Sequence, residues 1–377
     1  MKVGRECEFL IHLPPYDIFI QYASNVNRRG FCHFPIDNLL LIRYFVNHYM
    51  IILSMRNTMR NVFYSSGFLV LYFFCLGIGH PLCQESVAPT FVEYLAVWGE
   101  KGDGPGQFQS PQGISVDPAG FLYIADTGNQ RIQKLDAMGR FVGEIGGFGW
   151  EKEQFDHPVA LCASNGLDVF VADYYNQRIE RYDKDLHYLA SFTSSEEWPE
   201  HHRFGFPLDV ALSLQGELFC LDGENRRVLK LDVLGNPQSS FGDFDAGEGR
   251  LIDPQRLIVS NKEKVYISDE KDRRIVVFDI HGNYLQQVGD GVLERPAGMT
   301  FIDPNILLVV DRGPGTIVVF TDSGALTGHI RTESENIPLQ VQPYDVAAWR
   351  DRLYVLDNKN HRIVVFRWVY RQGWAPR

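Results

Sequence analysis

The chain has 377 residues, of which 45% are hydrophobic and 22% are charged, a composition typical of a packed globular protein. Its formal net charge is −11, and residues 91–377 carry 29 Lys and Arg side chains against 42 Asp and Glu. Clustered positive charge attracts a nucleic-acid backbone, so this balance argues against nucleic acid as the partner and leaves only a local basic patch as an exception.

Residues 1–54 form an unassigned extension with a mixed composition and no internal repeat. Polar residues such as Arg43 interrupt their one apolar stretch. Three interpretations stay open: a disordered extension, a second and poor membrane segment, or translated sequence upstream of a true start at Met50, Met55 or Met59. We favour the third.

Residues 55–84 are interpreted as a signal peptide or a signal-anchor helix. Arg56 and Arg60 precede an uncharged run at residues 62–79, and polar residues follow it. A positive flank followed by an apolar core is the order of a secretory signal, and the run is also near the lower length limit of a membrane-spanning helix. Both interpretations place the rest of the chain outside the cytoplasm, as a secreted, periplasmic or membrane-anchored protein. Cleavage and anchoring stay open, and residues 62–79 would hold the chain in the membrane if they are not cleaved.

From residue 91 onward the sequence repeats one unit six times. Each complete unit contains four short runs rich in Ile, Val, Leu, Tyr and Phe, bounded by Gly, Pro, Asn or Asp, which is typical of antiparallel strands joined by tight turns. An aspartate ends the second run of each unit, at Asp126, Asp173, Asp222, Asp269, Asp311 and Asp357. A proline opens each unit, at Pro111, Pro158, Pro207, Pro254, Pro296 and Pro343.

Four-stranded units at this period predict an all-β fold, a six-bladed β-propeller whose antiparallel blades surround a central channel. The sixth unit supplies only three strands, whereas residues 91–99 (F-V-E-Y-L-A-V-W-G) match the position of a fourth strand. We therefore predict that this N-terminal strand completes the last blade and closes the ring, because closure removes exposed sheet edges. The propeller would occupy residues 91–368, followed by a tail at residues 369–377, with the hydrophobic helix outside it.

The first unit carries a recognisable motif. Gly104 and Gly106 precede Pro111, and D-P-A-G and Y-I-A-D-T-G-N-Q-R-I follow. This pattern resembles the NHL repeat, and the resemblance covers about residues 91–368. It implies a six-bladed propeller, in agreement with the repeat count. The fifth unit departs from the pattern, with Pro314 at the usual asparagine position and Thr316 at the usual arginine.

An arginine stands five residues after the aspartate in every unit except the fifth. A catalytic residue would not be copied into every blade, so we interpret these pairs as turn architecture, in which carboxylate and guanidinium satisfy nearby backbone groups. The third residue after the aspartate is expected to adopt a left-handed backbone, since asparagine tolerates it. These residues are Asn129, Asn176, Asn225 and Asn360.

Function is expected where the repeats differ. The topology places the loop before each proline and the loop after each aspartate on one face, around the channel mouth, and varied polar groups on a rigid frame suit a binding face. We therefore predict a non-enzymatic binding or scaffold propeller, itself monomeric, that recognises a protein or peptide on this face. The candidate binding residues are Gln112, His157, Tyr174, Tyr175, Asp209, Asp253, Gln255, Arg256, Arg295, Tyr344 and Asp345.

The sequence contains no motif that indicates a cofactor, a metal site or catalytic residues. The six cysteines show no C-x-x-C spacing. One alternative stays open, a metal-dependent lyase or hydrolase centred on the channel, because an amidating lyase that binds metal through histidines resembles this fold. Only His157 lies beside one of the six prolines, and a zinc site needs three or four converging ligands.

Overall fold

The computed structural model describes residues 91–303, 305–331 and 340–369, together with five strands between residues 5 and 55. The chain divides into two compact units, Met1–His80 and Pro81–Arg377. The helix predicted at residues 62–79 lies outside the described residues, and so does nearly all of the predicted tail. Within the described part of the chain, no helix is long and apolar enough to span a membrane.

The first unit contains one antiparallel sheet, in the order β1-β2-β4-β5, with β3 paired to β2. Its strands are β1 (Arg5–Leu13), β2 (Tyr16–Val26), β3 (Cys32–His33), β4 (Leu40–Val46) and β5 (Tyr49–Met55).

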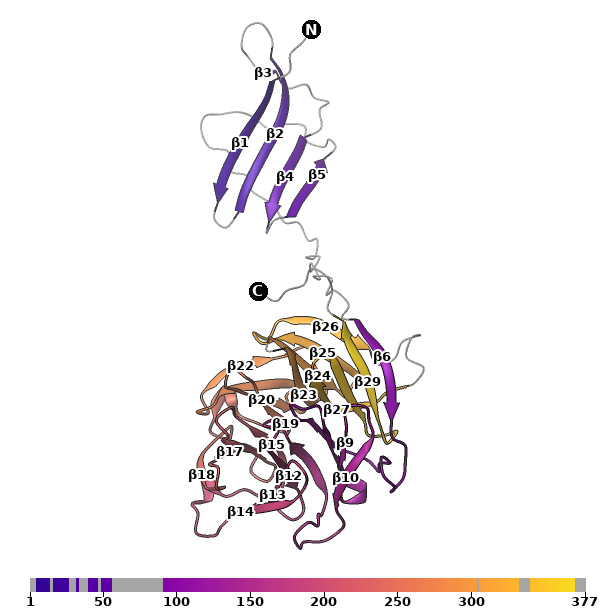
Figure 1. Ribbon diagram of the computed structural model, residues 1–377. Helices are drawn as coiled ribbons and strands as arrows, with labels where there is room; N and C mark the ends of the chain where they lie inside the picture. Colours follow the sequence, from indigo (N-terminus) through magenta and orange to yellow (C-terminus); the bar gives the residue numbers. More distant parts are fainter. Residues whose placement is uncertain are drawn as a thin grey trace. The chain divides into compact units, whose positions relative to one another are not determined.

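The second unit confirms the predicted architecture of six four-stranded antiparallel sheets, which form a six-bladed β-propeller (Figure 1). Blades one and two comprise β7 (Gly113–Val116), β8 (Leu122–Asp126), β9 (Arg131–Leu135), β10 (Phe141–Gly146), β11 (Pro158–Cys162), β12 (Asp168–Asp173), β13 (Arg178–Asp183) and β14 (Tyr188–Thr193). Blades three and four comprise β15 (Pro207–Leu212), β16 (Leu218–Asp222), β17 (Arg227–Leu231), β18 (Pro237–Phe241), β19 (Pro254–Val259), β20 (Lys264–Asp269), β21 (Arg274–Asp279) and β22 (Tyr284–Val288). Blades five and six comprise β23 (Pro296–Asp303), β24 (Ile306–Asp311), β25 (Thr316–Thr321), β26 (Leu326–Arg331), β27 (Pro343–Trp349), β28 (Arg352–Asp357), β29 (Arg362–Val369) and β6 (Phe91–Trp98).

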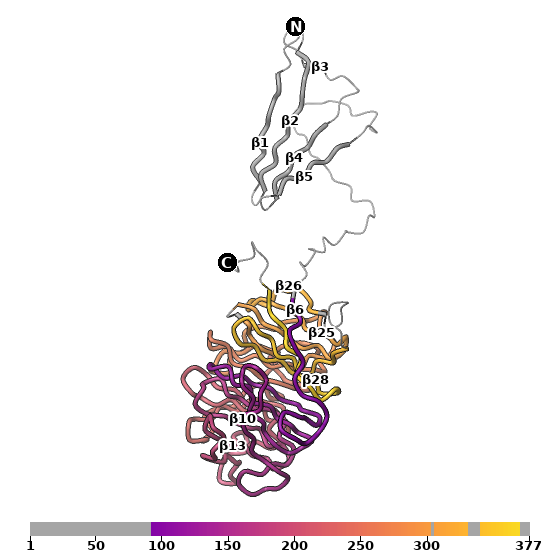
Figure 2. Tube along the Cα trace, turned by 45° about the vertical axis from the view of Figure 1, so that its right-hand side comes forward, coloured from indigo at the N-terminus to yellow at the C-terminus, as the bar shows by residue number. Residues whose placement is uncertain are grey.

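The six innermost strands form a closed ring. Each contacts the next, from β7 through β11, β15, β19 and β23 to β27, and β27 contacts β7. In the sixth sheet β6 lies beside β29, with Val97 opposite Val364. Figure 2 shows this first strand of the propeller next to the strands at its C-terminal end.

The core consists of six hydrophobic clusters, each of which fills the space between two adjacent blades. Every residue of β8 and β9 is buried, because both faces of a blade are covered, whereas the residues of the outer strand β10 are exposed or half-buried. A blade therefore cannot bury its apolar side chains alone. Each fully buried Val, Leu, Ile or Phe side chain contributes about 1.5–3 kcal/mol, which explains why closing the ring stabilises all six blades.

The turn after each aspartate differs from the prediction in one respect. The left-handed residue is the fourth after the aspartate and not the asparagine at the third position. In the first blade, Thr127–Asn129 form a short 3-10 helix that ends at the left-handed Gln130, a common way for a helical turn to end. The asparagine side chain instead donates to the aspartate, over 2.8 Å from Asn129 Nδ2 to Asp126 Oδ2. The residues with positive φ at the fourth position are Gln130, Gln177, Arg226, Arg273, Gly315 and His361.

Candidate functional site

The loops that carry the predicted residues do gather on one face, here called the proline face. In the second blade Pro158 pairs with Asp173, so the start of the innermost strand lies beside the end of the next. The two loops then bond directly, over 3.2 Å from the Tyr174 nitrogen to the His157 carbonyl oxygen. The same register joins the proline to the aspartate in blades three to six, as in the pair of Pro254 and Asp269.

The repeated aspartates and arginines build this face without being presented on it. Asp126 is fully buried, and its Oδ2 lies 2.9 Å from Arg131 Nε. Arg131 also donates to the carbonyl oxygens of Gly104 and Gln107 in the preceding loop. The equivalent pairs in the second, third and sixth blades lie 2.9, 3.4 and 2.9 Å apart. Each pair therefore fastens the loop that precedes its own blade's proline.

Five of the predicted residues meet in a continuous cluster over blades six, one and two. The imidazole of His157 lies 5.0 Å from the ring of Tyr175 and 6.2 Å from that of Tyr174, measured between ring centroids. Gln112 connects this group to the sixth blade, with its Nε2 3.4 Å from His157 Nε2 and its Oε1 3.3 Å from the Tyr344 hydroxyl. We call these five residues the aromatic arc.

Sequence reasoning missed one member of this surface. Phe206 stands directly before the proline of blade three, and its ring lies 5.2 Å from that of Tyr174. Phe206 and His157 both adopt positive φ, 49° and 66°, immediately before a proline. A non-glycine residue in this region is uncommon and often marks a functional loop. The sequence signal for Phe206 is its position, because it stands directly before a proline, as His157 does.

Charged residues continue the proline face across blades four and five. Arg295 donates to Glu270 over 2.8 Å, and Arg312 forms an ion pair with the same carboxylate. Arg312 also donates to Gln255, whose amide lies 3.2 Å from Asp253 Oδ1. The sequence alone does not predict Arg312 or Glu270 as members of this surface. We call these five residues the charged arc.

Tyr344 joins the two arcs. The guanidinium of Arg312 lies 5.0 Å from the centre of the Tyr344 ring, a cation–π contact. The same Tyr344 hydroxyl donates to Gln112 on the other side. The proline face therefore presents an aromatic half and a charged half that meet at one tyrosine.

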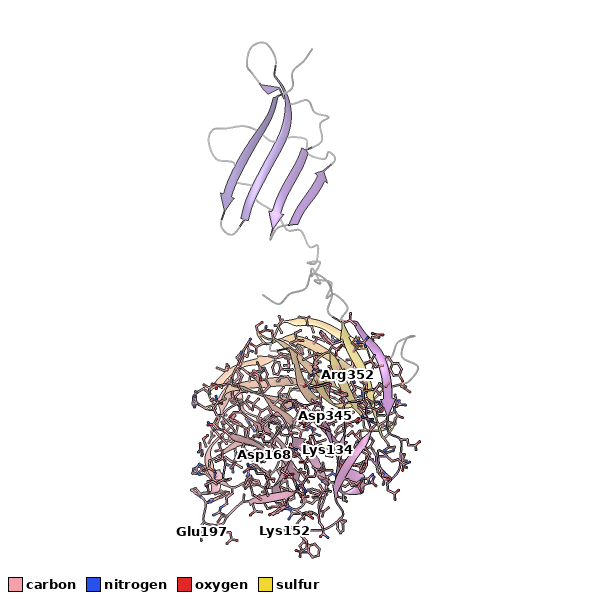
Figure 3. All side chains as sticks on the ribbon, viewed as in Figure 1. Lys134, Lys152, Asp168, Glu197, Asp345 and Arg352 are labelled. Atoms are coloured by element: carbon pink, nitrogen blue, oxygen red, sulfur yellow. The ribbon has the colours of Figure 1, made fainter. Side chains whose placement is uncertain are left out.

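The remaining three predicted residues, Asp209, Arg256 and Asp345, are buried on the innermost strands, and Figure 3 places Asp345 within the propeller. Asp209 Oδ2 accepts the backbone N–H of Leu257 over 2.8 Å, and Asp345 Oδ2 accepts that of Ile114 over 3.1 Å. Each carboxylate therefore bonds to the innermost strand of the next blade. Arg256 donates to carbonyl oxygens on blades one and two.

Burial changes the proton affinities of these buried groups. It raises the pKa of Asp209 to about 7 and that of Asp345 to about 6, although the nearby Arg256 opposes both shifts. Burial opposes the charge of Arg256 itself, but Asp345, Tyr344 and Asp209 outweigh it and raise the pKa of the guanidinium. Near neutral pH these carboxyls therefore exchange protons while Arg256 remains charged.

In the aromatic arc, the pKa values of His157 and Tyr174 are shifted in the directions that favour their uncharged forms. Burial lowers the pKa of His157, against the opposing charge of Asp156. Burial, followed by the neighbouring Tyr175, raises the pKa of Tyr174. The arc is therefore an uncharged, partly apolar surface at neutral pH. Across the residues that the structure describes, no group of three or more His, Cys, Asp or Glu side chains is arranged to hold a metal ion.

Comparison with known proteins agrees with this architecture. The NHL repeat family model matches residues 108–135 and 341–366, in the first and sixth blades. The chain is 28% identical over 131 residues to a probable peptidyl-alpha-hydroxyglycine alpha-amidating lyase of Caenorhabditis elegans, pgal-1. This alignment covers 33% of this chain and 37% of that protein. It is 41% identical over 134 residues to NHL repeat-containing protein 3 of Homo sapiens, which covers 33% of this chain and 39% of that protein. In both cases the chain matches under two fifths of the relative's length.

Among solved structures, a protein of unknown function from Bacteroides thetaiotaomicron superposes with a TM-score of 0.55. The alignment covers 96% of this chain and 98% of that one at 12% sequence identity, so it supports the fold alone. The chain therefore carries two segments that match the NHL repeat, in the first and sixth blades of a second unit that is a six-bladed β-propeller.

Proposed function

We propose that the propeller is a non-enzymatic binding module, exported or tethered to a membrane, whose proline face recognises a protein or peptide. The observation that carries this proposal is the aromatic arc, in which Tyr175 is 55% exposed although it packs against His157. Exposed aromatic side chains held in place by neighbours are typical anchors of protein interfaces. Export rests on the apolar run at residues 62–79 behind Arg56 and Arg60.

The two arcs suggest which segment would fit. An apolar side chain of the partner would lie on Tyr175 and His157, because these rings are uncharged and already desolvated on one side. Polar groups of the partner would face Arg295, whose side chain is largely exposed although it pairs with Glu270. A peptide with an apolar residue and, several residues away, an acidic one matches this arrangement, because Tyr175 belongs to blade two and Arg295 to blade five, on opposite sides of the ring.

The test is affinity capture from the native host with purified propeller, comparing Tyr175→Ala and Arg295→Ala with the matched control Leu189→Ala. Leu189 is 50% exposed but lies on the outer strand β14, away from the proline face. A partner of the proline face is lost with Tyr175→Ala, weakened with Arg295→Ala and retained with Leu189→Ala. Retention by both arc variants, or loss with Leu189→Ala, would place the binding surface elsewhere.

The second candidate is a metal-dependent lyase or hydrolase, favoured by the similarity to the probable amidating lyase. In this chain His157 would be the histidine nearest to such a site, and it already lies beside Gln112 and Tyr175. Metal analysis of the purified protein separates the two candidates. A stoichiometric metal ion that disappears in His157→Ala would favour the enzyme over the pure binding module.

A further inference from the structure

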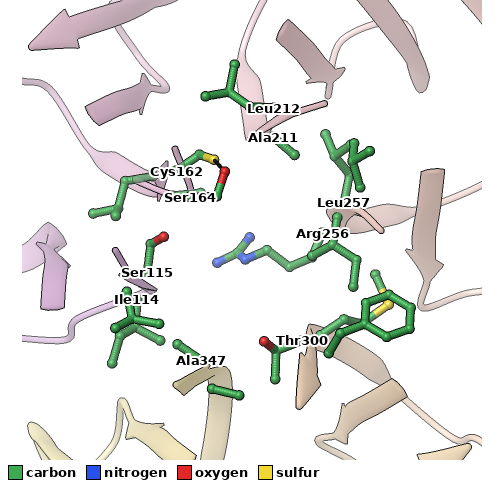
Figure 4. A pocket seen from close by; sticks show the side chains of 18 of the residues that line it. Ile114, Ser115, Cys162, Ser164, Ala211, Leu212, Arg256, Leu257, Thr300 and Ala347 are labelled. Atoms are coloured by element: carbon green, nitrogen blue, oxygen red, sulfur yellow. Dashed lines mark hydrogen bonds between the residues drawn. The ribbon is translucent and has the colours of Figure 1, made fainter. Parts of the chain in front are cut away.

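The central channel is bridged by one of the protein's own side chains. Figure 4 shows Arg256 extending into the middle of the channel cavity. Its terminal nitrogens donate to the carbonyl oxygens of Gln255, Gln112 and Val159, so this guanidinium ties blades together. The channel therefore contributes a structural link, whereas an outer loop, at residues 147–153, presents side chains that the fold does not need.

Two large aromatic side chains are exposed on this loop, which follows the outer strand β10 of blade one. Phe148 is 69% exposed and Trp150 is 73% exposed. Figure 3 shows Lys152 of the same loop at the outer edge of the propeller. Tryptophan is a common anchor of protein interfaces, because it buries a large contact area with few rotatable bonds. Both rings lie outside the aromatic arc and the charged arc.

The blade architecture does not require aromatic residues at these two positions. The same isolated β-bridge forms in the loops before blades one and two, through Lys101 in the first loop and Phe148 in the second. Counted from these residues, Trp150 corresponds to Asp103. Charged residues therefore suffice at both positions in blade one, and the aromatic pair of blade two is a departure from the repeat.

The backbone of the loop is held in place although its aromatic side chains are exposed. Arg178 Nη1 donates to the carbonyl oxygen of Trp150 over 2.9 Å, as Arg131 Nη1 does to that of Asp103 over 2.6 Å. Asn176 Nδ2 also donates to the carbonyl oxygen beside it, that of residue 149, over 2.8 Å. A surface that is ordered before binding loses less conformational entropy when a partner binds.

The corresponding loop before blade four shows which group such a ring binds. Phe244 is 73% exposed there, and the guanidinium of Arg250 lies 4.1 Å from the centre of its ring. The loop at residues 147–153 contains one cation, Lys152, whose ammonium instead lies 5.1 Å from the centre of the Tyr188 ring. Among the residues that the structure describes, no Lys or Arg side chain forms a cation–π contact with Trp150. A cation from a partner would complete the same arrangement.

Acidic residues line an open cavity of about 510 Å³ beside this loop. Its wall includes Asp103, Glu144 and Glu153, with Arg131 as the one cation. The guanidinium of Arg131 donates to both Glu144 and Asp126, so its charge is already balanced. Within the described part of the chain, Asp103 and Glu153 form no ion pair. The cavity therefore favours a positively charged group.

We propose that the exposed rings of Phe148 and Trp150, together with this cavity, bind an arginine-bearing segment of a protein partner. We call this surface the acidic rim. Gly147, directly before Phe148, also lines the cavity, so the rings and the carboxylates of Asp103 and Glu153 belong to one surface. Arginine suits both contacts, because its planar group stacks on aromatic rings and pairs with carboxylates. The acidic rim shares no residue with either arc and does not depend on the function proposed for them.

The experiment selects random linear heptapeptides, displayed on phage, for binding to the purified protein, and then measures single synthetic peptides by fluorescence anisotropy. We expect the selected peptides to be enriched in arginine. Replacing the arginine by uncharged citrulline should weaken binding about tenfold or more, because the cation–π contact and the ion pair both require the charge. A selection without enrichment of arginine, or equal binding of the citrulline peptide, overturns the proposal.

Matched substitutions locate the site. Trp150→Ala should weaken binding of the selected peptides about tenfold or more, as the loss of an interface anchor does. Phe244→Ala removes an equally exposed ring that already carries Arg250 and should leave binding unchanged. The double change Asp103→Asn and Glu153→Gln should weaken binding and reduce its dependence on salt. Equal effects of Trp150→Ala and Phe244→Ala would overturn the acidic rim as the binding surface.

One further variant separates this proposal from the function proposed for the two arcs. Arg295→Ala alters the charged arc and should leave binding of the arginine peptides unchanged. Peptides that lose affinity with Arg295→Ala but not with Trp150→Ala would support binding by the charged arc and overturn the acidic rim.

Discussion

Arg256 on the fourth blade donates a hydrogen bond from Nη2 to the carbonyl oxygen of Gln112 on the first blade, 2.8 Å across the channel. Blades four and one are opposite each other in a six-membered ring. The same Nη2 also reaches Val159 on the second blade. One side chain therefore bonds three blades that share no strand pairing.

Because of this cross-channel link, we expect the loss of the Arg256 side chain to lower the free energy of unfolding by a large amount. Arg256→Met should destabilise the protein by about 3–5 kcal/mol, because Asp209 and Asp345 would remain buried without a compensating charge. The matched change Arg295→Met affects an exposed arginine paired with Glu270 and should cost at most about 1 kcal/mol. Urea unfolding of both variants measures the difference. Equal costs would mean that the link does not contribute to stability.

Replacing the repeated aspartate is expected to lower the stability of the protein by different amounts in different blades. Asp126 bonds to Arg131, Asn129 and the Gln109 nitrogen, so Asp126→Asn should remove the buried counter-charge of Arg131 and leave it paired only with the more exposed Glu144. In the fourth blade the aspartate and the arginine have separate partners. Asp269 accepts backbone N–H groups of the loop before Pro254, whereas Arg274 pairs with Asp272.

We therefore expect Asp126→Asn to lower the free energy of unfolding by about 2–4 kcal/mol more than Asp269→Asn. Both variants keep the shape of the side chain, so the comparison isolates the buried ion pair. Chemical denaturation provides the measurement, and a larger loss for Asp269→Asn would contradict the interpretation of these pairs.

The buried carboxyl of Asp209 predicts a pH dependence with a definite sign. Its pKa is raised to about 7 in the folded protein, against about 3.9 for an unfolded aspartate. The folded state therefore holds this proton more tightly, and the group's contribution to stability is complete at acidic pH and decreases as the pH rises from about 4 to about 7.

Asp209→Asn removes this titration while Asp322 and Glu270, whose pKa values are lowered, remain in both proteins. The free energy of unfolding of the wild type relative to Asp209→Asn should therefore fall between pH 5 and pH 8. Denaturant titrations at the two pH values measure it. A difference that is constant or increases with pH would show that Asp209 is ionised throughout.

The sequence predicted the blades more fully than the site. Spacing alone identified six sheets, because each blade repeats the same proline, aspartate and strand pattern. It did not separate surface residues from channel residues, since Gln112 and Asp345 follow their prolines by only one and two positions. The side chain of Gln112 lies in the aromatic arc, whereas that of Asp345 bonds to Ile114 inside the ring. A register shift in the strand pairing directly after Pro343 contributes to this difference.

Other parts of the site depend on contacts between blades, which a single repeat does not encode. Arg312 follows the aspartate and not the proline of its unit, so its position in the repeat does not reveal that it joins Glu270 of the fourth blade to Tyr344 of the sixth. The prediction places the left-handed turn residue one position too early. The asparagine side chain bonds to the aspartate from within the helical turn, and the turn ends at the following residue, which adopts the left-handed backbone.

The innermost strands of the fifth and sixth blades approach each other closely at Gly298. A Cβ atom on Gly298 would lie 2.5 Å from the Cα atom of Asp345 and 2.2 Å from its Oδ1. The backbone of β27 would have to move, and the bond from Asp345 to Ile114 would move with it. Gly298→Ala should therefore lower the free energy of unfolding by about 1–3 kcal/mol or more, as overpacking of a well-packed interior does.

Gly143→Ala is the matched control, because nothing lies within 4 Å of its Cβ position on the outer strand β10. This change should be nearly neutral or slightly stabilising. Thermal and urea unfolding of the two variants measure the contrast. If Gly298→Ala is as stable as Gly143→Ala, the innermost strands of blades five and six are not packed as closely as the structure places them.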